Sequence, residues 1–109
     1  MARLARKPRP RRPAAGVRQR FSSGTPWEPA VGYSRAVRVG AHVYVSGTTA
    51  TADDGSIEGV DDPYRQTVRT LDNIERGLRG VGSRREAIVR LRIFVIDPGR
   101  VGDVTRALA

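Results

Sequence analysis

An amphipathic segment, residues 63–80, restricts the fold of this 109-residue chain more than any other feature. Its apolar side chains recur at helical spacing, at Tyr64, Val68, Leu71, Ile74 and Leu78. Asp61 or Asp62 can cap the N-terminus, and Pro63 suits the first helical position. The glycines of "GLRGVG" end the periodic pattern. The sequence therefore predicts a long helix that buries one face against another element.

A hairpin upstream of the helix is the expected partner surface. Residues 34–39 and 42–45 alternate apolar with polar side chains, a pattern typical of strands with one buried face. Gly40 and Ala41 supply the turn. His42 opens the second strand, and no acid or nucleophile stands beside it to make it a catalytic base. We interpret it as a half-exposed strand residue.

The remaining elements complete a helix-and-strand order. Residues 53–55 predict a turn, and residues 56–58 a short return strand. Residues 87–97, "AIVRLRIFVID", alternate apolar with basic side chains and predict a strand strongly buried on one side. After the break at Asp97-Pro98-Gly99, residues 101–108 predict a second, short helix. The fold class is therefore α+β with the helices packed on one face of the sheet, which lacks a closing strand.

The net charge of +9 is concentrated at the N-terminus. Residues 1–20 hold eight Lys and Arg and no acid, whereas the rest of the chain holds twelve basic and eleven acidic residues. Three prolines oppose a regular helix there. We predict a disordered extension over residues 1–21 and one domain over residues 22–109. The extension is interpreted as a solvated leader, with a nucleic-acid-binding arm and a targeting peptide as alternatives.

Composition excludes several kinds of site. The chain has no cysteine and one histidine, so neither a disulfide framework nor a thiolate or multi-histidine metal site is expected. No apolar run approaches the roughly 18 residues of a membrane span. We expect a soluble, cytoplasmic protein without a metal.

Two further patterns have competing interpretations. "FSSGTPWEPA" is expected to be a loop in which Trp27 covers the edge of the core and Glu28 is an exposed acid. Gly77-Leu78-Arg79-Gly80 has the GxxG spacing of the nucleotide-clamping loop of a KH domain. Helix termination explains the same glycines, and we prefer it.

Three stretches together resemble a known family. They are "VGYSRAVRVGAHVYVSGTTAT", "DPYRQTVRTLDNIERGLRGVGS" and "IVRLRIFVIDPGRVGDV". In this order and spacing they are similar to the motifs of the RidA (YjgF) family of reactive intermediate/imine deaminases, over residues 22–109. The resemblance implies a chorismate-mutase-like fold with a mixed sheet, and homotrimers with ligand clefts between subunits. Compared with that fold, the chain is expected to be truncated and the sheet incomplete at the C-terminus.

The resemblance also implies a ligand site. In the family, Ser-Gly after the second strand lines the cleft and an upstream tyrosine closes over the ligand; these positions are Ser46, Gly47 and Tyr33 here. Thr48 and Thr105 are weaker neighbours. A strand end leaves N–H groups uncovered at a glycine, and Ser46 adds a hydroxyl, so a small carboxylate can be held there. The residues alone leave open that Ser46-Gly47 simply ends a strand.

The implied activity is hydrolysis of 2-imino or enamine acids to 2-keto acids and ammonia, without a metal or cofactor. The arginine and glutamate of active members would lie beyond Ala109, and we expect Arg90 and Arg92 to face solvent rather than replace that arginine. No catalytic residue is therefore assigned. The alternatives are a non-catalytic binder of small imino or keto acids, an inactive truncated member, and an RNA-binding translation inhibitor acting through the basic tail.

Overall fold

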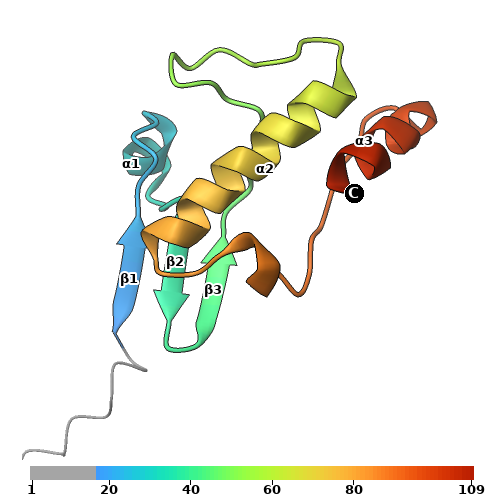
Figure 1. Cartoon of the computed structure of the whole chain (residues 1–109). Coiled ribbons are helices and arrows are strands. Elements are labelled where there is room, and N and C mark those ends of the chain that lie inside the picture. The colour runs from blue at the N-terminus through green and yellow to red at the C-terminus, as the bar shows by residue number, and fades with distance from the viewer. Residues whose placement is uncertain (1–16) are drawn as a thin grey trace, which may run out of the picture.

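The computed structural model describes residues 17–109 and shows a sheet with one long helix across it (Figure 1). The predictions for residues 1–16 lie outside the described residues. In chain order, the strands and helices are β1 Arg18–Phe21, α1 Trp27–Val31, β2 Ala36–Val39, β3 His42–Val45, α2 Pro63–Gly80 and α3 Val101–Leu108. Two 3₁₀ turns, Arg85–Ala87 and Pro98–Arg100, precede α3. The described part is thus an α+β structure, as predicted.

The sheet has the order β1-β2-β3 and is antiparallel throughout. The predicted hairpin is confirmed, since β2 and β3 pair from Ala36 with Val45 to Val39 with His42, and Gly40 has a positive φ of 60° in the turn. Ala36 is fully buried under α2, whereas Tyr44 on the opposite face is 64% exposed. One face of the sheet is therefore covered within the chain, and the other is open.

Strand β1 corrects the predicted domain boundary. Residues 18–21 were assigned to the disordered extension, but they pair with β2 from Arg18 with Val39 to Phe21 with Ala36. The ring of Phe21 packs on α2 at Gly80, where an added Cβ would clash with the ring. Pairing with β2 provides backbone hydrogen bonds that composition alone does not reveal.

Helix α2 begins as its sequence predicts. Asp62 Oδ1 accepts a hydrogen bond from the backbone N–H of Arg65 at 3.1 Å, and Pro63 occupies the first turn. Gly77 lies inside the helix, where an added Cβ would be 3.3 Å from Ala36 Cβ. The GxxG interpretation is therefore wrong, because Gly77–Gly80 is helical and permits close approach of helix and sheet rather than forming a nucleotide-binding loop.

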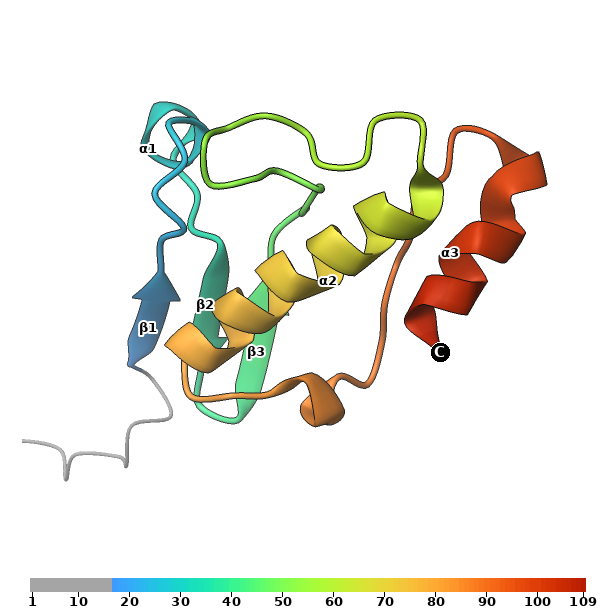
Figure 2. The same cartoon turned by 45° about the horizontal axis from the view of Figure 1, so that its top comes forward.

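Helix α3 packs against α2, and the two views agree on this arrangement (Figures 1 and 2). Val104 is 7% exposed, and the guanidinium of Arg106 lies 4.9 Å from the centre of the Tyr64 ring. Together with Ala36, the buried apolar residues on α2 and α3 and in the loops form a small core; they are Ala50, Leu78, Val81 and Val104.

The predicted strand over residues 87–97 is not formed. Apart from the end of a 3₁₀ turn, this segment has no regular structure, and the side chains of Val89 and Ile96 are essentially fully exposed. A strand needs backbone hydrogen bonds to a neighbouring strand, and none of the described strands pairs with residues 87–97. The predicted return strand at residues 56–58 is reduced to a single bridge between Thr51 and Ile57.

Among the described residues, no helix has the length and apolar character to cross a membrane.

Candidate ligand-binding site

The side chain of Arg35 forms hydrogen bonds with three of the five predicted site residues. The aliphatic part of its side chain lies beside Gly77 of α2, and the residue is 7% exposed. Nη1 donates to the carbonyl oxygen of Gly47 at 2.6 Å and to Thr48 Oγ1 at 3.2 Å. Nη2 donates to the hydroxyl of Tyr33 at 3.4 Å, and the guanidinium carbon lies 5.5 Å from the centre of that ring. Sequence analysis missed Arg35 because an arginine next to a strand is usually solvated.

Ser46 lies at the end of β3 but its hydroxyl is already engaged. Ser46 Oγ donates to the carbonyl oxygen of Ser34 at 2.6 Å, and its backbone N–H donates to the carbonyl oxygen of Arg35 at 3.0 Å. Thr48 Oγ1 donates to the carbonyl oxygen of Ser46 at 2.7 Å. Ser46 therefore holds the end of the hairpin in place, which positions Gly47 and Thr48.

Thr105 is not brought to this cluster within the chain. It is exposed on α3, and its hydroxyl donates to the carbonyl oxygen of Val101 at 3.0 Å. The α3 helix contacts the start of α2 at Tyr64, whereas Arg35 contacts α2 at Gly77. Tyr64 and Gly77 are thirteen positions apart along α2, which corresponds to roughly 20 Å. The two views place α1 and α3 on opposite sides of the molecule (Figures 1 and 2).

Glu28 is buried rather than exposed, and the expectation for it was wrong. Its two carboxylate oxygens accept hydrogen bonds from the backbone and hydroxyl groups of Ser23 and Thr25 and from the backbone N–H of Arg35. Burial raises its pKa, but the hydrogen bonds from Ser23 and Thr25 outweigh burial and lower the pKa to about 2. The Thr-x-x-Glu spacing of Thr25 and Glu28 is the capping-box signal that would have predicted this contact.

The expectation that Trp27 covers the edge of the core was also wrong. It starts α1 and is 64% exposed, so it does not cover the core. Because Trp27 and Glu28 are adjacent in a helix, turning the carboxylate of Glu28 inward directs the indole outward.

Arg35 and Glu28 are connected through a hydroxyl group. Ser23 Oγ accepts from Arg35 Nε at 3.4 Å and donates to Glu28 Oε2. None of the ion pairs among residues 17–109 includes Arg35. Its guanidinium is thus held by neutral oxygens only, next to the predicted ligand-binding positions.

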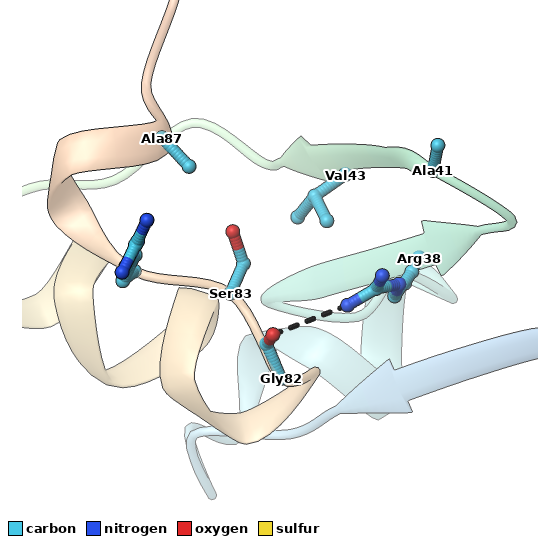
Figure 3. A pocket seen from close by; sticks show the side chains of 7 residues that line it. Arg38, Ala41, Val43, Gly82, Ser83 and Ala87 are labelled. Carbon is cyan, nitrogen blue, oxygen red and sulfur yellow. Dashed lines mark hydrogen bonds between the residues drawn. The ribbon is translucent and has the colours of Figure 1, made fainter.

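A separate pocket of about 400 Å³ lies beside the turn of the hairpin (Figure 3). It is lined by Arg38, Ala41, Val43, Gly82, Ser83, Arg84 and Ala87. Arg38 Nη1 donates to the carbonyl oxygens of Val81 and Gly82, at 3.1 and 3.2 Å. The pocket shares no residue with the Arg35 cluster, and it was not predicted. We place the candidate site at the Arg35 cluster because the predicted residues converge there.

No metal centre is evident: within residues 17–109, no three His, Cys, Asp or Glu side chains are grouped so as to hold an ion.

Comparison with known proteins identifies the class to which this α+β structure belongs. The chain matches the family described as Endoribonuclease L-PSP over residues 24–109. The crystal structure of Rv2704 from Mycobacterium tuberculosis, a member of the YjgF/YER057c/UK114 family, is 41% identical with a TM-score of 0.73, covering 84% of this chain and 70% of that one. The structure of YjgH is 27% identical with a TM-score of 0.68, covering 80% and 67%.

Two curated relatives agree with this assignment. The uncharacterised protein SCO2049 of Streptomyces coelicolor is 36% identical over 89 residues, which are 82% of this chain and 66% of the relative. The mitochondrial protein mmf2 of Schizosaccharomyces pombe is 34% identical over 65 residues, which are 60% and 50% of the two chains. The matched part spans just under two thirds and one half of these relatives. This chain belongs to the YjgF/L-PSP (RidA) family and has its chorismate-mutase-like fold.

Proposed function

We propose that this chain binds a small 2-imino or 2-keto acid at the cluster of Tyr33, Gly47 and Thr48, and that the protein hydrolyses reactive imino acids. The observation that carries the proposal is the convergence of these three residues on one buried guanidinium. Gly47 is exposed and Tyr33 half-buried, so the cluster has a side that faces solvent. A small anion that approaches from that side would contact the guanidinium of Arg35 and the phenol of Tyr33.

The proposed reaction consumes only water. The oxygen of a water molecule adds to the carbon of the C=N bond, and the nitrogen takes up a proton from that water. The C–N bond of the resulting carbinolamine then breaks, ammonia leaves, and the hydroxyl loses its proton to become the ketone. A fixed cation beside the carboxylate holds the substrate while the hydroxyl of Tyr33 remains available as a hydrogen-bonding group.

The proposal includes a homotrimer. Val89, Phe94 and Ile96 are 99%, 88% and 103% exposed, and Tyr44 lies on the open face of the sheet. Large apolar side chains exposed together are typical of association surfaces.

The test is ammonia release from 2-aminoacrylate generated in solution, together with thermal shift in the presence of pyruvate and 2-ketobutyrate. The variant Tyr33→Phe removes the hydroxyl next to Arg35, and Tyr64→Phe is its matched control because Tyr64 lies at the start of α2, beside Arg106 and away from Arg35. We expect Tyr33→Phe to lower the rate by about tenfold or more and Tyr64→Phe to leave it unchanged. Stabilisation by keto acids without ammonia release above buffer would show a binder rather than an enzyme. The absence of both effects would contradict the proposal.

A further inference from the structure

The inference concerns the buried guanidinium of Arg35 and rests on the proposed function. Arg35 and Glu28 are the two charged residues buried in the described part of the chain. A buried charge is costly unless it is compensated by a partner of opposite charge and by hydrogen bonds. A buried charged side chain that lacks such partners within the chain is therefore a candidate for binding a ligand.

Both carboxylate oxygens of Glu28 have hydrogen-bond donors within the chain, so its hydrogen bonds need no ligand. Its Oε1 accepts from the backbone N–H groups of Ser23 and Arg35, and its Oε2 accepts from the hydroxyls of Ser23 and Thr25 and the N–H of Thr25. Glu28 reaches the guanidinium of Arg35 only through the hydroxyl of Ser23.

Arg35 is compensated only in part. Nε donates to Ser23 Oγ, and both N–H groups of Nη1 have acceptors, in Gly47 and Thr48. Of the two N–H groups of Nη2, one reaches the hydroxyl of Tyr33 and the other has no acceptor among the described residues. All of these acceptors are neutral. By contrast, seven other described arginines pair with carboxylates; they are Arg65, Arg69, Arg76, Arg79, Arg85, Arg100 and Arg106.

The free N–H of Nη2 and the hydroxyl of Tyr33 make a pair of neighbouring donors. Nη2 and Tyr33 Oη lie 3.4 Å apart, so one carboxylate can accept from both, one oxygen to each. The hydroxyl of Tyr33 then turns from accepting to donating, which a phenol permits.

We infer that Arg35 is the cation that binds the carboxylate of the proposed 2-imino or 2-keto acid. Arg35 is a ligand-binding residue in this inference, and Ser23 and Glu28 are positioning residues that hold its Nε side.

The test compares pyruvate with pyruvamide, which has the same shape but no charge, by calorimetry on the wild type and on Arg35→Gln. We expect the wild type to prefer pyruvate, and Arg35→Gln to reduce that preference by about tenfold or more. The matched control is Arg38→Gln on β2, whose guanidinium is held by the carbonyl oxygens of Gly40, Val81 and Gly82. It should leave the preference unchanged.

The outcomes separate the two proposals. A variant that weakens both ligands equally, or that keeps the preference for pyruvate, contradicts the inference but not the proposed function. A wild type that binds neither ligand contradicts the proposed function and with it the inference. Should Arg35→Gln fail to fold, the guanidinium NMR resonances of Arg35 in the wild type provide the readout. These resonances should shift when pyruvate is added and should not shift when pyruvamide is added. Any other result overturns the inference.

Discussion

At the scale of the residue, Glu28 shows how hydrogen bonds can overcome the electrostatic cost of burial. Burial disfavours its charged form, but the hydrogen bonds from Ser23 and Thr25 favour it, and the pKa falls to about 2 from an ordinary value of 4.5. The same carboxylate fixes Ser23, which supports Arg35 in turn. A residue remote from the predicted ligand positions thus helps to define their geometry.

The pKa of Glu28 predicts a dependence of stability on pH. Because the folded pKa lies below the unfolded value, Glu28 stabilises the fold above about pH 4.5, and this contribution is lost as the pH falls toward 2. We expect Glu28→Gln to destabilise the protein at pH 7 and the difference from wild type to shrink between pH 4.5 and 2, measured by urea unfolding. The control is Glu86→Gln, at an exposed position. A difference that stays constant over this range would contradict the assignment.

At the scale of the element, α2 organises the loop that carries the candidate site. Asn73 Nδ2 donates to the carbonyl oxygens of Thr49 and Thr51, at 3.0 and 2.9 Å, directly after Gly47 and Thr48. The helix therefore holds the loop as well as covering the sheet.

Asn73→Leu should loosen that loop. The two carbonyl oxygens lose their donor, and we expect a loss of about 1–2 kcal/mol in unfolding free energy together with faster amide hydrogen exchange at residues 48–51. The matched control is Gln66→Leu, because the amide of Gln66 makes the same kind of bond from α2 to the carbonyl oxygen of Gly59 in a different part of the loop. It should cost similar stability without speeding exchange at residues 48–51. Equal exchange rates in the two variants would show that Asn73 does not hold the site.

At the scale of the whole molecule, the described part leaves two surfaces uncovered. One is the open face of the sheet, where Tyr44 is exposed, and the other is the extended segment of residues 88–97, which exposes several large apolar side chains. Among residues 17–109, the buried core is limited to a few small and medium side chains. Burying these surfaces between subunits would add apolar area that the single chain lacks.

We therefore expect association that depends on the extended segment. Sedimentation velocity over the micromolar range should show a species larger than the monomer, consistent with the proposed trimer, and Phe94→Lys should shift it toward monomer. Ile57→Lys is the control, because Ile57 is also exposed but lies in the loop before α2. A wild type that remains monomeric, or equal effects of the two substitutions, would contradict this prediction.

Much of the framework was predictable because its signals are local. The cap at Asp62, the hairpin with its turn at Gly40 and the helix at residues 101–108 are confirmed. The apolar stripe of α2 is buried only at Leu78, whereas Tyr64 and Val68 at the other end of the helix are exposed. Within α2, Glu75 pairs with Arg79 at i,i+4 spacing, whereas Asp72 and Arg76 pair with Arg85 and Asp53, which lie outside the helix. Helical spacing predicts ion pairs within one helix. An exposed side chain can also pair with residues of other elements, which only the fold brings close.

The sequence by itself determined the helices and the hairpin, since periodicity, caps and turns act over a few residues, and its motifs determined the family. Only the tertiary structure decided that residues 18–21 form a strand, that residues 88–97 do not, and that Thr105 lies apart from Tyr33. It also decided that Arg35 and Glu28 turn inward. The physical reason is the same in each case: strand pairing and the burial of a charge depend on partners that are distant in the sequence and are brought close only by the fold.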